Sequence, residues 1–513
     1  MTRSGDNRRI SMVVLFLALT TPIIGSDTRS QTSLAREDDC KCIAAFDNLV
    51  SKIEADYVGY HLAIKGKRDA EYRRNVEAIG ARARRTPPES CIFVLQNFLR
   101  FFRDGHLFVG NSPRLNRDEV EYLNRTARRV ARSENEVRRY LDISGGRLDP
   151  LEGIWYAKEG YRVAITRNPG RGRGEFLALM LSDDLPGWIR GQVKAQFRRL
   201  RDGSYDVVFY DKNHSPRYPN VYLRGQLGGA ALRRGLLLHM PPITWGKAYP
   251  LRPNERGLLD PVDPRRPTIR AVDESTVVVS VPSHSPEYTA LLESLIEEFH
   301  DRILRANNLL IDIRGDEGGS AGMTRALMPF LVTKDKRSSP ADAGTHAVVL
   351  SSPDNIRYFE QMHSQGWVPL RLVERMRANP GKVISFDDPD SRSDVAPAAD
   401  SATPLPRNVA ILIDGAVVSA GEAFVLNAMK NKKVILFGEN TGGVIDYQSV
   451  TIIDLSNCPA LGLYLGYPTS AASDQLPAGG INATGIPPDI RIWRAIKDPI
   501  RYVIEYYAQR ERQ

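Results

Sequence analysis

The chain has 513 residues, of which 42% are hydrophobic, 26% charged and 8% aromatic. This is the composition of a globular protein, and it excludes collagen-like, low-complexity and disordered classes. The formal charge of +9 is mild, and no run of Lys and Arg is interleaved with aromatic residues. Nucleic-acid binding is therefore not indicated, and the excess charge is interpreted as a solvated helical face.

The first 26 residues predict export. Three arginines precede an apolar run over residues 12–24, which ends at the small residues Gly25 and Ser26. A basic start, a short apolar stretch and a small-residue end are typical of a secretory signal peptide. The run is short for a membrane span, so a retained single anchor is the alternative. We expect an exported protein, periplasmic or extracellular, with no stable span after signal removal.

Export makes the four cysteines candidates for disulfides, which persist outside the cytosol. We expect one bridge from Cys40 or Cys42 to Cys91, closing a helical hairpin of about 50 residues. The fourth cysteine, Cys458, lies far downstream. A zinc site is disfavoured because the Cys-x-Cys spacing is tight and no His pair stands at finger spacing.

The residues after the signal divide into three predicted domains. Residues 40–147 are expected to form a helical domain, because apolar residues such as Phe46, Leu49 and Ile53 recur at helical spacing. Residues 148–266 carry aromatic and β-branched segments separated by Gly, Asn and Asp, and predict a small antiparallel β domain. Residues 267–513 alternate buried strands with helices, which is typical of an α/β sheet. The fold class is multidomain α+β, with a surface loop expected over residues 386–406.

The first candidate catalytic motif is the turn Val417-Val418-Ser419-Ala420-Gly421-Glu422, which follows a predicted buried strand. A strand that turns sharply into a helix can present a Ser hydroxyl where backbone N–H groups favour developing negative charge. The competing interpretation is that Ser419 only caps the helix, since Ser is a preferred N-cap residue.

Each of two further motifs, taken alone, allows either a functional or a purely structural interpretation. Gly318 and Gly319 follow the predicted strand over residues 308–314, and their flexible backbone can approach a ligand closely or form a plain turn. His106 lies in the loop Arg103-Asp104-Gly105-His106, where most histidines are simply on the surface.

Together, in this order, the three motifs resemble those of the C-terminal (tail-specific) processing serine peptidases, and more closely their tricorn-core branch, which uses a Ser–His pair. The resemblance implies a ClpP/crotonase-like peptidase domain. It implies Ser419 as the nucleophile and His106 as the base. It also implies an oxyanion hole formed by the N–H of Gly318 or Gly319 and by that of Ala420.

The sequence departs from the family pattern at two places. The Ser–Lys branch has a Lys where this chain has Thr441-Gly442-Gly443-Val444, while Lys430, Lys432 and Lys433 fall too early. The Glu that orients the His in the Ser–His branch is replaced by Asn482. An Asn can hold the imidazole tautomer but stabilises imidazolium less than a carboxylate does. Alternatively, Asp446 or Asp474 takes this role.

The sequence thus predicts an exported serine endopeptidase that hydrolyses protein or peptide substrates through an acyl-enzyme, with no metal or other cofactor. The alternative is a catalytically weak or inactive peptidase-fold protein that binds peptides or partners. Acyl-CoA chemistry on the related fold is a third hypothesis, which leaves the His loop and the Ser turn unexplained. The aromatic β domain has no assigned role, and the sequence does not indicate an oligomeric state.

Overall fold

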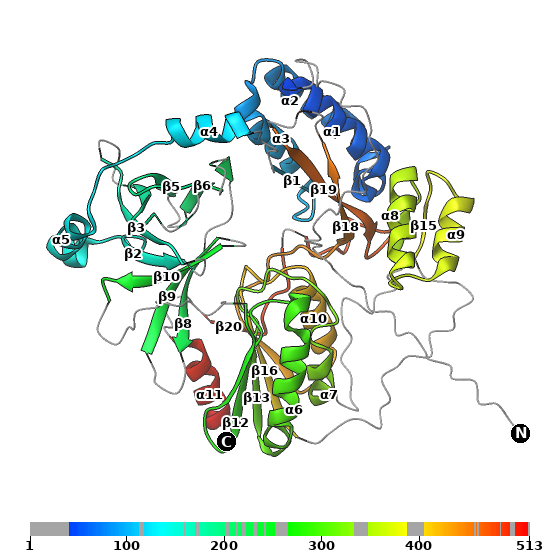
Figure 1. Ribbon diagram of the computed structural model, residues 1–513. Coiled ribbons are helices and arrows are strands. Elements are labelled where there is room, and N and C mark those ends of the chain that lie inside the picture. The colour runs from blue at the N-terminus through cyan, green and yellow to red at the C-terminus, as the bar shows by residue number, and fades with distance from the viewer. Residues whose placement is uncertain are drawn as a thin grey trace, which may run out of the picture. The chain divides into compact units, whose positions relative to one another are not determined.

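The computed structural model describes residues 40–510 with internal gaps (Figure 1). The gaps are residues 112–116, 158–159, 170–171, 173, 184, 186, 201–204, 212–213, 215, 218–221, 229–232, 241–242, 252–264, 333–346, 387–404, 456–457, 459–460, 483 and 493–497. The predicted signal peptide, and nearly all of the loop expected over residues 386–406, lie outside the described residues.

The chain forms two compact units rather than the three domains expected. Unit 1 comprises residues 1–112 and 265–513, and unit 2 comprises residues 113–264. The boundary predicted near residue 147 therefore differs from the structure, because the charged helices after residue 112 cluster with the β segment. The two sequence segments that contain His106 and Ser419 belong to one unit.

The N-terminal segment of unit 1 is helical, as its periodicity predicted. Phe46 and Phe98 are buried and meet edge to face, with ring centroids 5.2 Å apart. This contact joins the first and third α-helices. The elements are α1 (Cys42–Asp56), η2 (Tyr60–Ile64), α2 (Asp69–Ala83), η3 (Pro88–Ser90), α3 (Cys91–Leu99) and η4 (Arg100–Phe102).

A five-stranded sheet connects this helical segment to the C-terminal half of unit 1. Strand β1 (Phe108–Asn111), directly after the His loop, pairs antiparallel with β19 (Leu463–Ala471). The sheet has the order β1-β19-β14-β15, and β18 also pairs with β19. Its remaining elements, with two flanking helices, are β14 (Val348–Leu350), β15 (Val383–Ser385), β18 (Tyr447–Asp454), α8 (Pro353–Ser364) and α9 (Leu370–Ala378).

A six-stranded sheet is the α/β core of unit 1. Its order is β11-β12-β13-β16-β17-β20, parallel from β12 onward, with β11 antiparallel at one edge. The strands are β11 (Thr268–Ala271), β12 (Thr276–Ser280), β13 (Asn308–Asp312), β16 (Asn408–Ile413), β17 (Val434–Gly438) and β20 (Ile490–Arg491). The apolar strands predicted here are confirmed as a buried parallel sheet, which needs cover on both faces.

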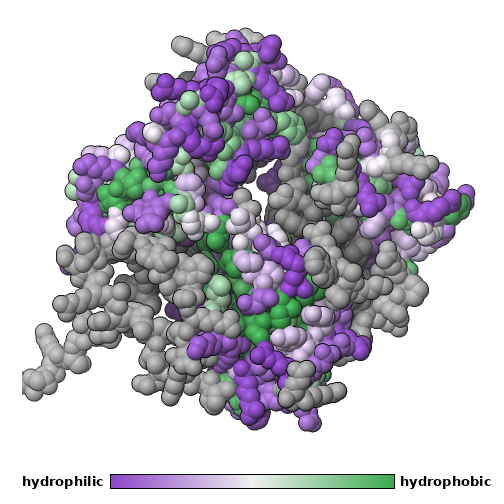
Figure 2. Space-filling view, turned by 180° about the vertical axis from the view of Figure 1, so that it is seen from behind, coloured by the Kyte–Doolittle hydropathy of each residue, from purple (hydrophilic) through white to green (hydrophobic). Residues whose placement is uncertain are grey.

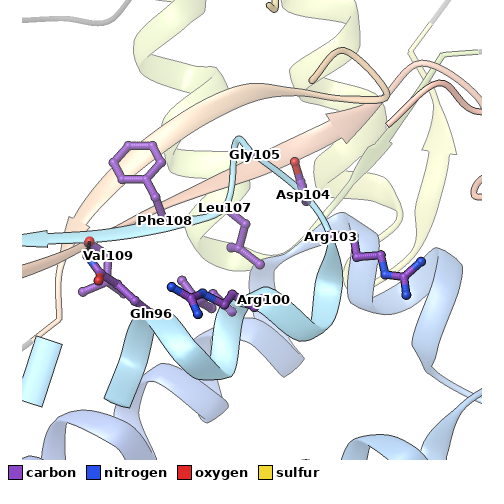
Figure 3. Close-up of a pocket in the computed structure, with 9 residues that line it drawn as sticks. Gln96, Arg100, Arg103, Asp104, Gly105, Leu107, Phe108 and Val109 are labelled. Carbon is purple, nitrogen blue, oxygen red and sulfur yellow. Dashed lines mark hydrogen bonds between the residues drawn. The ribbon is translucent and has the colours of Figure 1, made fainter. Parts of the chain in front are cut away.

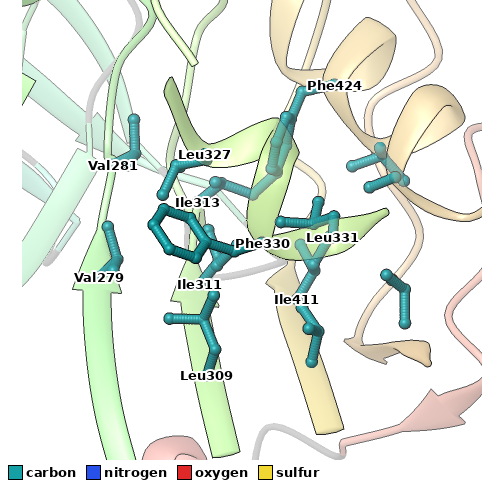
Figure 4. Close-up of a cluster of buried hydrophobic side chains, with 14 of the residues drawn as sticks. Val279, Val281, Leu309, Ile311, Ile313, Leu327, Phe330, Leu331, Ile411 and Phe424 are labelled. Atoms are coloured by element: carbon teal, nitrogen blue, oxygen red, sulfur yellow. The ribbon is translucent and has the colours of Figure 1, made fainter. Parts of the chain in front are cut away.

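Alternate residues of these strands pack against helices on opposite faces. Leu309 and Ile311 face one core, which includes Phe330 and Phe424 (Figure 4). Leu310, one position between them, belongs to a second core with α11 (Pro499–Arg510). The helices that complete the first face are η6 (Pro286–Tyr288), α6 (Thr289–Arg305), η7 (Arg325–Leu327), α7 (Met328–Leu331) and α10 (Ala420–Ala428).

Unit 2 contains a nine-stranded antiparallel sheet around the buried Trp155 and Trp245. Its order is β7-β6-β5-β4-β3-β2-β10-β9-β8. The strands are β2 (Gly153–Ala157), β3 (Arg162–Arg167), β4 (Glu175–Met180), β5 (Val193–Arg199), β6 (Tyr205–Tyr210), β7 (Pro216–Arg217), β8 (Tyr222–Gly228), β9 (Arg233–Met240) and β10 (Ile243–Tyr249). The helices are α4 (Arg117–Thr126), α5 (Glu134–Ser144) and η5 (Gly145–Arg147). An antiparallel sheet was predicted, although its strands β5, β7, β9 and β10 were not.

Two disulfides tie unit 1 together. Cys42–Cys91 is one of the two pairings that the sequence allowed for the predicted bridge. A second bridge, Cys40–Cys458, was not predicted and spans 418 positions. No helix among the described residues is both long and apolar enough to span a membrane. Most of the described surface visible in Figure 2 is hydrophilic.

Candidate active site

Ser419 lies in a strained turn between β16 and α10. Its backbone has φ 56° and ψ −119°, and its side chain is almost fully buried. An ordinary N-cap residue has an extended backbone with negative φ, so capping alone does not account for this conformation. Positive φ at a residue other than Gly is costly and is concentrated at functional sites. A serine on a sharp strand-to-helix turn is the arrangement of a nucleophile.

The glycine pair after β13 lies directly against Ser419. A Cβ added to Gly318 would stand 2.7 Å from the Ser419 Cβ and 3.1 Å from its Oγ. Gly318 has φ 83°, so both its space and its backbone conformation favour glycine. The loop therefore makes a close approach. The group that it approaches is the serine turn.

The two glycines differ in what their N–H groups do. The N–H of Gly318 donates to Asp316 Oδ1 at 3.0 Å. The N–H groups of Gly319 and Ala420 donate to no acceptor within the described part of the chain. Of the two glycines offered by the sequence as oxyanion donors, Gly319 is thus the one with an uncommitted N–H.

A buried Asp–His pair supports this loop, and sequence reasoning missed it. The Asp316 carboxylate accepts from the backbone N–H of His284 at 3.0 Å and contacts the His284 ring at Nδ1. Both side chains are fully buried. The backbone carbonyl of Asp316 also accepts from the Val418 N–H at 3.1 Å, beside the serine turn. The order of the strands could have indicated this pair, because His284 and Asp316 follow the adjacent parallel strands β12 and β13.

The His106 loop is anchored from inside unit 1. The Asp104 carboxylate accepts from the His106 N–H at 2.9 Å and from the Tyr57 hydroxyl at 2.8 Å. Burial raises the pKa of Asp104 to about 7, with a smaller contribution from Asp446, while its two hydrogen bonds act in the opposite direction. The loop is therefore held by α1 as well as by its own backbone.

The His106 ring is oriented by a backbone carbonyl. Its Nδ1 lies 2.6 Å from the carbonyl oxygen of Tyr447. Because a carbonyl only accepts, this contact favours the tautomer with hydrogen on Nδ1 and a lone pair on Nε2. Burial lowers the pKa of His106 below its usual 6.5, which keeps the imidazole neutral and able to accept a proton.

The atom found at His106 Nδ1 is thus the Tyr447 carbonyl oxygen, whereas Asn482 was the residue expected there. Asn482 Oδ1 accepts from the backbone N–H groups of Ile445 and Asp446, at 3.1 and 3.0 Å. Asp446 in turn accepts from the Asn482 N–H at 2.8 Å. These reciprocal hydrogen bonds hold the segment that leads to Tyr447, while the Asn482 side-chain nitrogen is buried without a hydrogen-bond partner among the described residues. Asp474, the other acid considered, is exposed.

Glu422 connects the serine turn to the segment beneath the His loop. Its Oε2 accepts from the Ser419 N–H at 3.3 Å and from the Val444 N–H at 2.7 Å. Its Oε1 accepts from the Gly443 N–H at 2.8 Å and from the Thr441 hydroxyl. Burial raises the pKa of Glu422, and these bonds counteract part of that effect. The sequence predicted only a capping or packing role.

Val444 carries this connection on to His106. A Cβ added to Gly105 would lie 2.8 Å from both γ-carbons of Val444, so the two loops are in close contact. Ser419 and the His106 loop are therefore linked through one buried carboxylate and one valine. The geometry brings together Ser419, Gly318, Gly319 and Ala420, and it connects the His106 loop to them.

Lys433 lies at the amino-terminal end of the parallel strands, opposite to the end at which Ser419 lies. It immediately precedes β17, whose first residue pairs with Val409 near the start of β16. Ser419 follows the other end of β16. Burial lowers the pKa of Lys433 to about 8, but a strand length separates it from Ser419. Within the described residues, no group of three or more His, Cys, Asp or Glu could hold a metal ion.

A pocket of about 360 Å³ lies on the helical side of the His106 loop (Figure 3). Its lining comes from α3, η4, the loop itself and β1. The lining residues are Gln96, Leu99, Arg100, Arg103, Asp104, Gly105, Leu107, Phe108 and Val109. The loop that carries His106 therefore has open space beside it.

The family comparison supports a serine-type peptidase. Residues 275–492 match the model of peptidase family S41, which is a family of serine peptidases. The matched region contains Ser419, both glycines and Asn482. His106 lies outside it.

The chain also matches several solved structures at low sequence identity. Mature CPAF is 12% identical, with 88% of this chain and 93% of that chain covered and a TM-score of 0.42. The photosystem II D1 C-terminal processing protease is 14% identical, over 90% and 93% of the two chains, with a TM-score of 0.34. The tricorn protease is 12% identical, over 93% of this chain and 37% of that chain, with a TM-score of 0.36. No curated protein sequence matches.

Proposed function

We propose that this protein is an exported serine endopeptidase of the tail-specific type, which cleaves protein substrates through a Ser–His acyl-enzyme mechanism. One observation carries the proposal. Ser419, in a positive-φ turn, lies against Gly318 and beside the uncommitted N–H groups of Gly319 and Ala420. A nucleophile next to two preorganised donors is what acyl transfer requires.

In this mechanism His106 Nε2 accepts the hydroxyl proton of Ser419 as Oγ attacks the peptide carbonyl. The N–H groups of Gly319 and Ala420 stabilise the oxyanion of the tetrahedral intermediate. The imidazolium then returns the proton to the leaving amine, and the C–N bond breaks to give an acyl-enzyme. Water, deprotonated by His106, attacks the ester and releases the carboxylic acid product and Ser419.

The environment of His106 favours slow turnover. A carboxylate at Nδ1 stabilises the imidazolium that forms in the transition state, whereas a neutral carbonyl does so more weakly. The Tyr447 carbonyl occupies that position. The neutral carbonyl favours a second candidate function. The protein would then be a weakly active or inactive peptidase-fold protein that binds peptides or partners.

Export is supported by the cysteines. All four described cysteines are paired in two bridges, which is characteristic of proteins that fold in oxidising compartments. The sequence of residues 1–26 supports the same proposal. Proteolysis outside the cytosol would act on exported or extracellular protein chains.

The test is covalent labelling by a serine-reactive phosphonate, together with hydrolysis of an unfolded protein such as casein. We expect the native protein to be labelled at Ser419, and Ser419→Ala to abolish both labelling and hydrolysis. His106→Gln should abolish hydrolysis and slow labelling. Ser351→Ala, which removes another buried hydroxyl, is the matched control and should leave both unchanged.

The pH profile gives an independent check. Because the pKa of His106 is lowered, activity should persist as the pH falls through 6.5 and decline only below it. Equal labelling of the native protein and Ser419→Ala would overturn the nucleophile assignment. Labelling without hydrolysis at any pH would favour the inactive, binding protein.

A further inference from the structure

The formal charge of the chain resides in unit 2. Residues 113–264 contain 27 Lys and Arg against 18 Asp and Glu, a difference of +9. The two segments of unit 1 together contain 43 of each, so they account for none of the chain's excess. Of the 27 basic residues in unit 2, 23 are arginines. The excess charge is thus confined to the unit that has no role in the proposed chemistry.

Unit 2 also contains a pocket that concentrates arginines. Its volume is about 690 Å³, and it lies where α5 and η5 meet the end of β3. Apart from Pro169, every residue that lines it can donate a hydrogen bond. The lining residues are Arg132, Tyr140, Ser144, Arg147, Arg167, Asn168 and Pro169.

One wall of the pocket is held by a buried carboxylate. Glu152 is fully buried and accepts from the Asp149 N–H at 2.8 Å and from Arg167 Nε at 3.4 Å. The Tyr140 hydroxyl also donates to it. Arg167 is further fixed by a 2.9 Å bond from its Nη2 to the Arg147 carbonyl. Arg167 and Tyr140 are therefore positioned by the protein, and the charge of Arg167 is balanced.

The other two guanidinium groups have no carboxylate within hydrogen-bond distance among the described residues. Arg132 stacks over the Tyr140 ring at 5.5 Å and lies near the solvent-exposed Glu136, whose carboxylate accepts from Ser133. Arg147 is exposed, and its side chain forms no ion pair in the described part of the chain. The guanidinium groups of Arg132 and Arg147 thus border the pocket, together with Ser144.

We propose that this pocket binds carboxylates of an acidic segment in the protein substrate. Guanidinium groups match carboxylates in planar, bidentate hydrogen bonds, and arginine is favoured over lysine at such sites. A substrate chain rich in Asp and Glu would also be attracted by the net charge of unit 2. The identification of the ligand as a polypeptide rests on the proposed peptidase function, whereas the anion site itself does not.

The experiment measures binding without catalysis. Full-chain Ser419→Ala protein is titrated against a fluorescein-labelled peptide containing six consecutive glutamates, with the matching glutamine peptide as reference. Fluorescence anisotropy gives the Kd. We expect the glutamate peptide to bind and Arg132→Gln/Arg147→Gln to weaken its binding by roughly tenfold or more, because hydrogen bonds between charged groups are stronger than neutral ones.

The control is Arg190→Gln/Arg198→Gln, which removes the same charge elsewhere in unit 2. These guanidinium groups pair with Asp183 and Asp206 and lie outside the pocket. Equal weakening by both double variants would show long-range charge attraction only and overturn the proposal. So would tighter, pocket-dependent binding of a single-stranded oligonucleotide. Neither result would affect the peptidase assignment, which phosphonate labelling tests separately.

Discussion

At the scale of single residues, Asp316 determines the shape of the loop beside Ser419. Its Oδ1 accepts from the N–H groups of His284 and Gly318, both at 3.0 Å, and its Oδ2 contacts the His284 ring. The next N–H along the chain after Gly318 is that of Gly319. Asp316 is therefore the positioning residue for the proposed oxyanion donor, on which it acts through the backbone.

Asp316→Ala should lower kcat by about 10²–10³, the cost of losing one oxyanion donor, with little change in KM. Asp316→Asn keeps an oxygen in the Oδ1 position and should recover much of this loss. Steady-state hydrolysis of a fixed peptide substrate measures both values.

The control for general damage is Asp312→Asn at the end of β13, which removes the acceptor of the bond from Arg314 Nη2 to Asp312 Oδ2 without touching Gly318. Thermal unfolding ranks the three variants by stability. If kcat follows stability in all three, Asp316 acts only as a structural residue.

At the scale of elements, the loop between η4 and β1 depends on one carboxyl group. Asp104 joins this loop to Tyr57 at the end of α1, and burial raises its pKa from 3.8 to about 7. A raised pKa means that the folded state favours the protonated form. The corresponding stability is present below pH 3.8 and is lost as the pH rises through about 7.

Asp104→Asn should remove this dependence, because the amide stays neutral throughout. Relative to the native protein, the variant should gain on the order of 4 kcal/mol of unfolding free energy between pH 4 and pH 8. Denaturant unfolding at the two pH values measures it. Asp47→Asn, on the exposed side of α1, should show no such gain. An equal response in both variants would contradict the assignment to Asp104.

The elements that the sequence predicted are those with a strong local pattern. Continuous apolar runs such as residues 308–312 and 408–413 identified the buried parallel strands, because both faces of such strands are covered. Strands β5, β9 and β10 were missed, since their arginines and glycines interrupt the alternation on which strand prediction depends. The unit boundary was also missed, because β1 pairs with β19 from the far end of the chain.

The same distinction applies to the candidate site. Ser419 and the two glycines were candidates because small residues after a buried strand are visible in sequence, but their roles were implied only by the family resemblance. The contact between His106 and Tyr447 could not be predicted. Every residue has a backbone carbonyl, and nothing in the sequence shows which carbonyl lies next to the His106 ring. Asn482 was selected by analogy of position. Glu422 stood at the spacing of a capping box, but its bonds to residues 441–444 depend on tertiary structure.

At the scale of the whole molecule, the two disulfides constrain unit 1 differently. Cys42–Cys91 closes a separation of 49 residues within the helical segment, and Cys40–Cys458 closes one of 418 residues. In the chain-entropy account these loops correspond to roughly 4 and roughly 6 kcal/mol of stability. The long bridge also carries the first described residue to the segment between β18 and β19.

Reduction should therefore lower the thermal midpoint, and Cys40→Ser/Cys458→Ser should lower it at least as much as Cys42→Ser/Cys91→Ser. Differential scanning calorimetry with and without a reductant measures both effects. If neither pair of substitutions lowers the midpoint, the bridges add nothing to stability in solution.

The Cys40–Cys458 bridge has a consequence for the integrity of the enzyme. Unit 2 is inserted between the two segments of unit 1, so one cut within residues 113–264 would separate His106 and Ser419 onto different polypeptides. The bridge would keep these polypeptides covalently joined as a two-chain molecule. A nicked sample would run as one band on a non-reducing gel and as two after reduction. Such a protein could be trimmed in its own inserted unit while still holding both halves of its candidate catalytic pair.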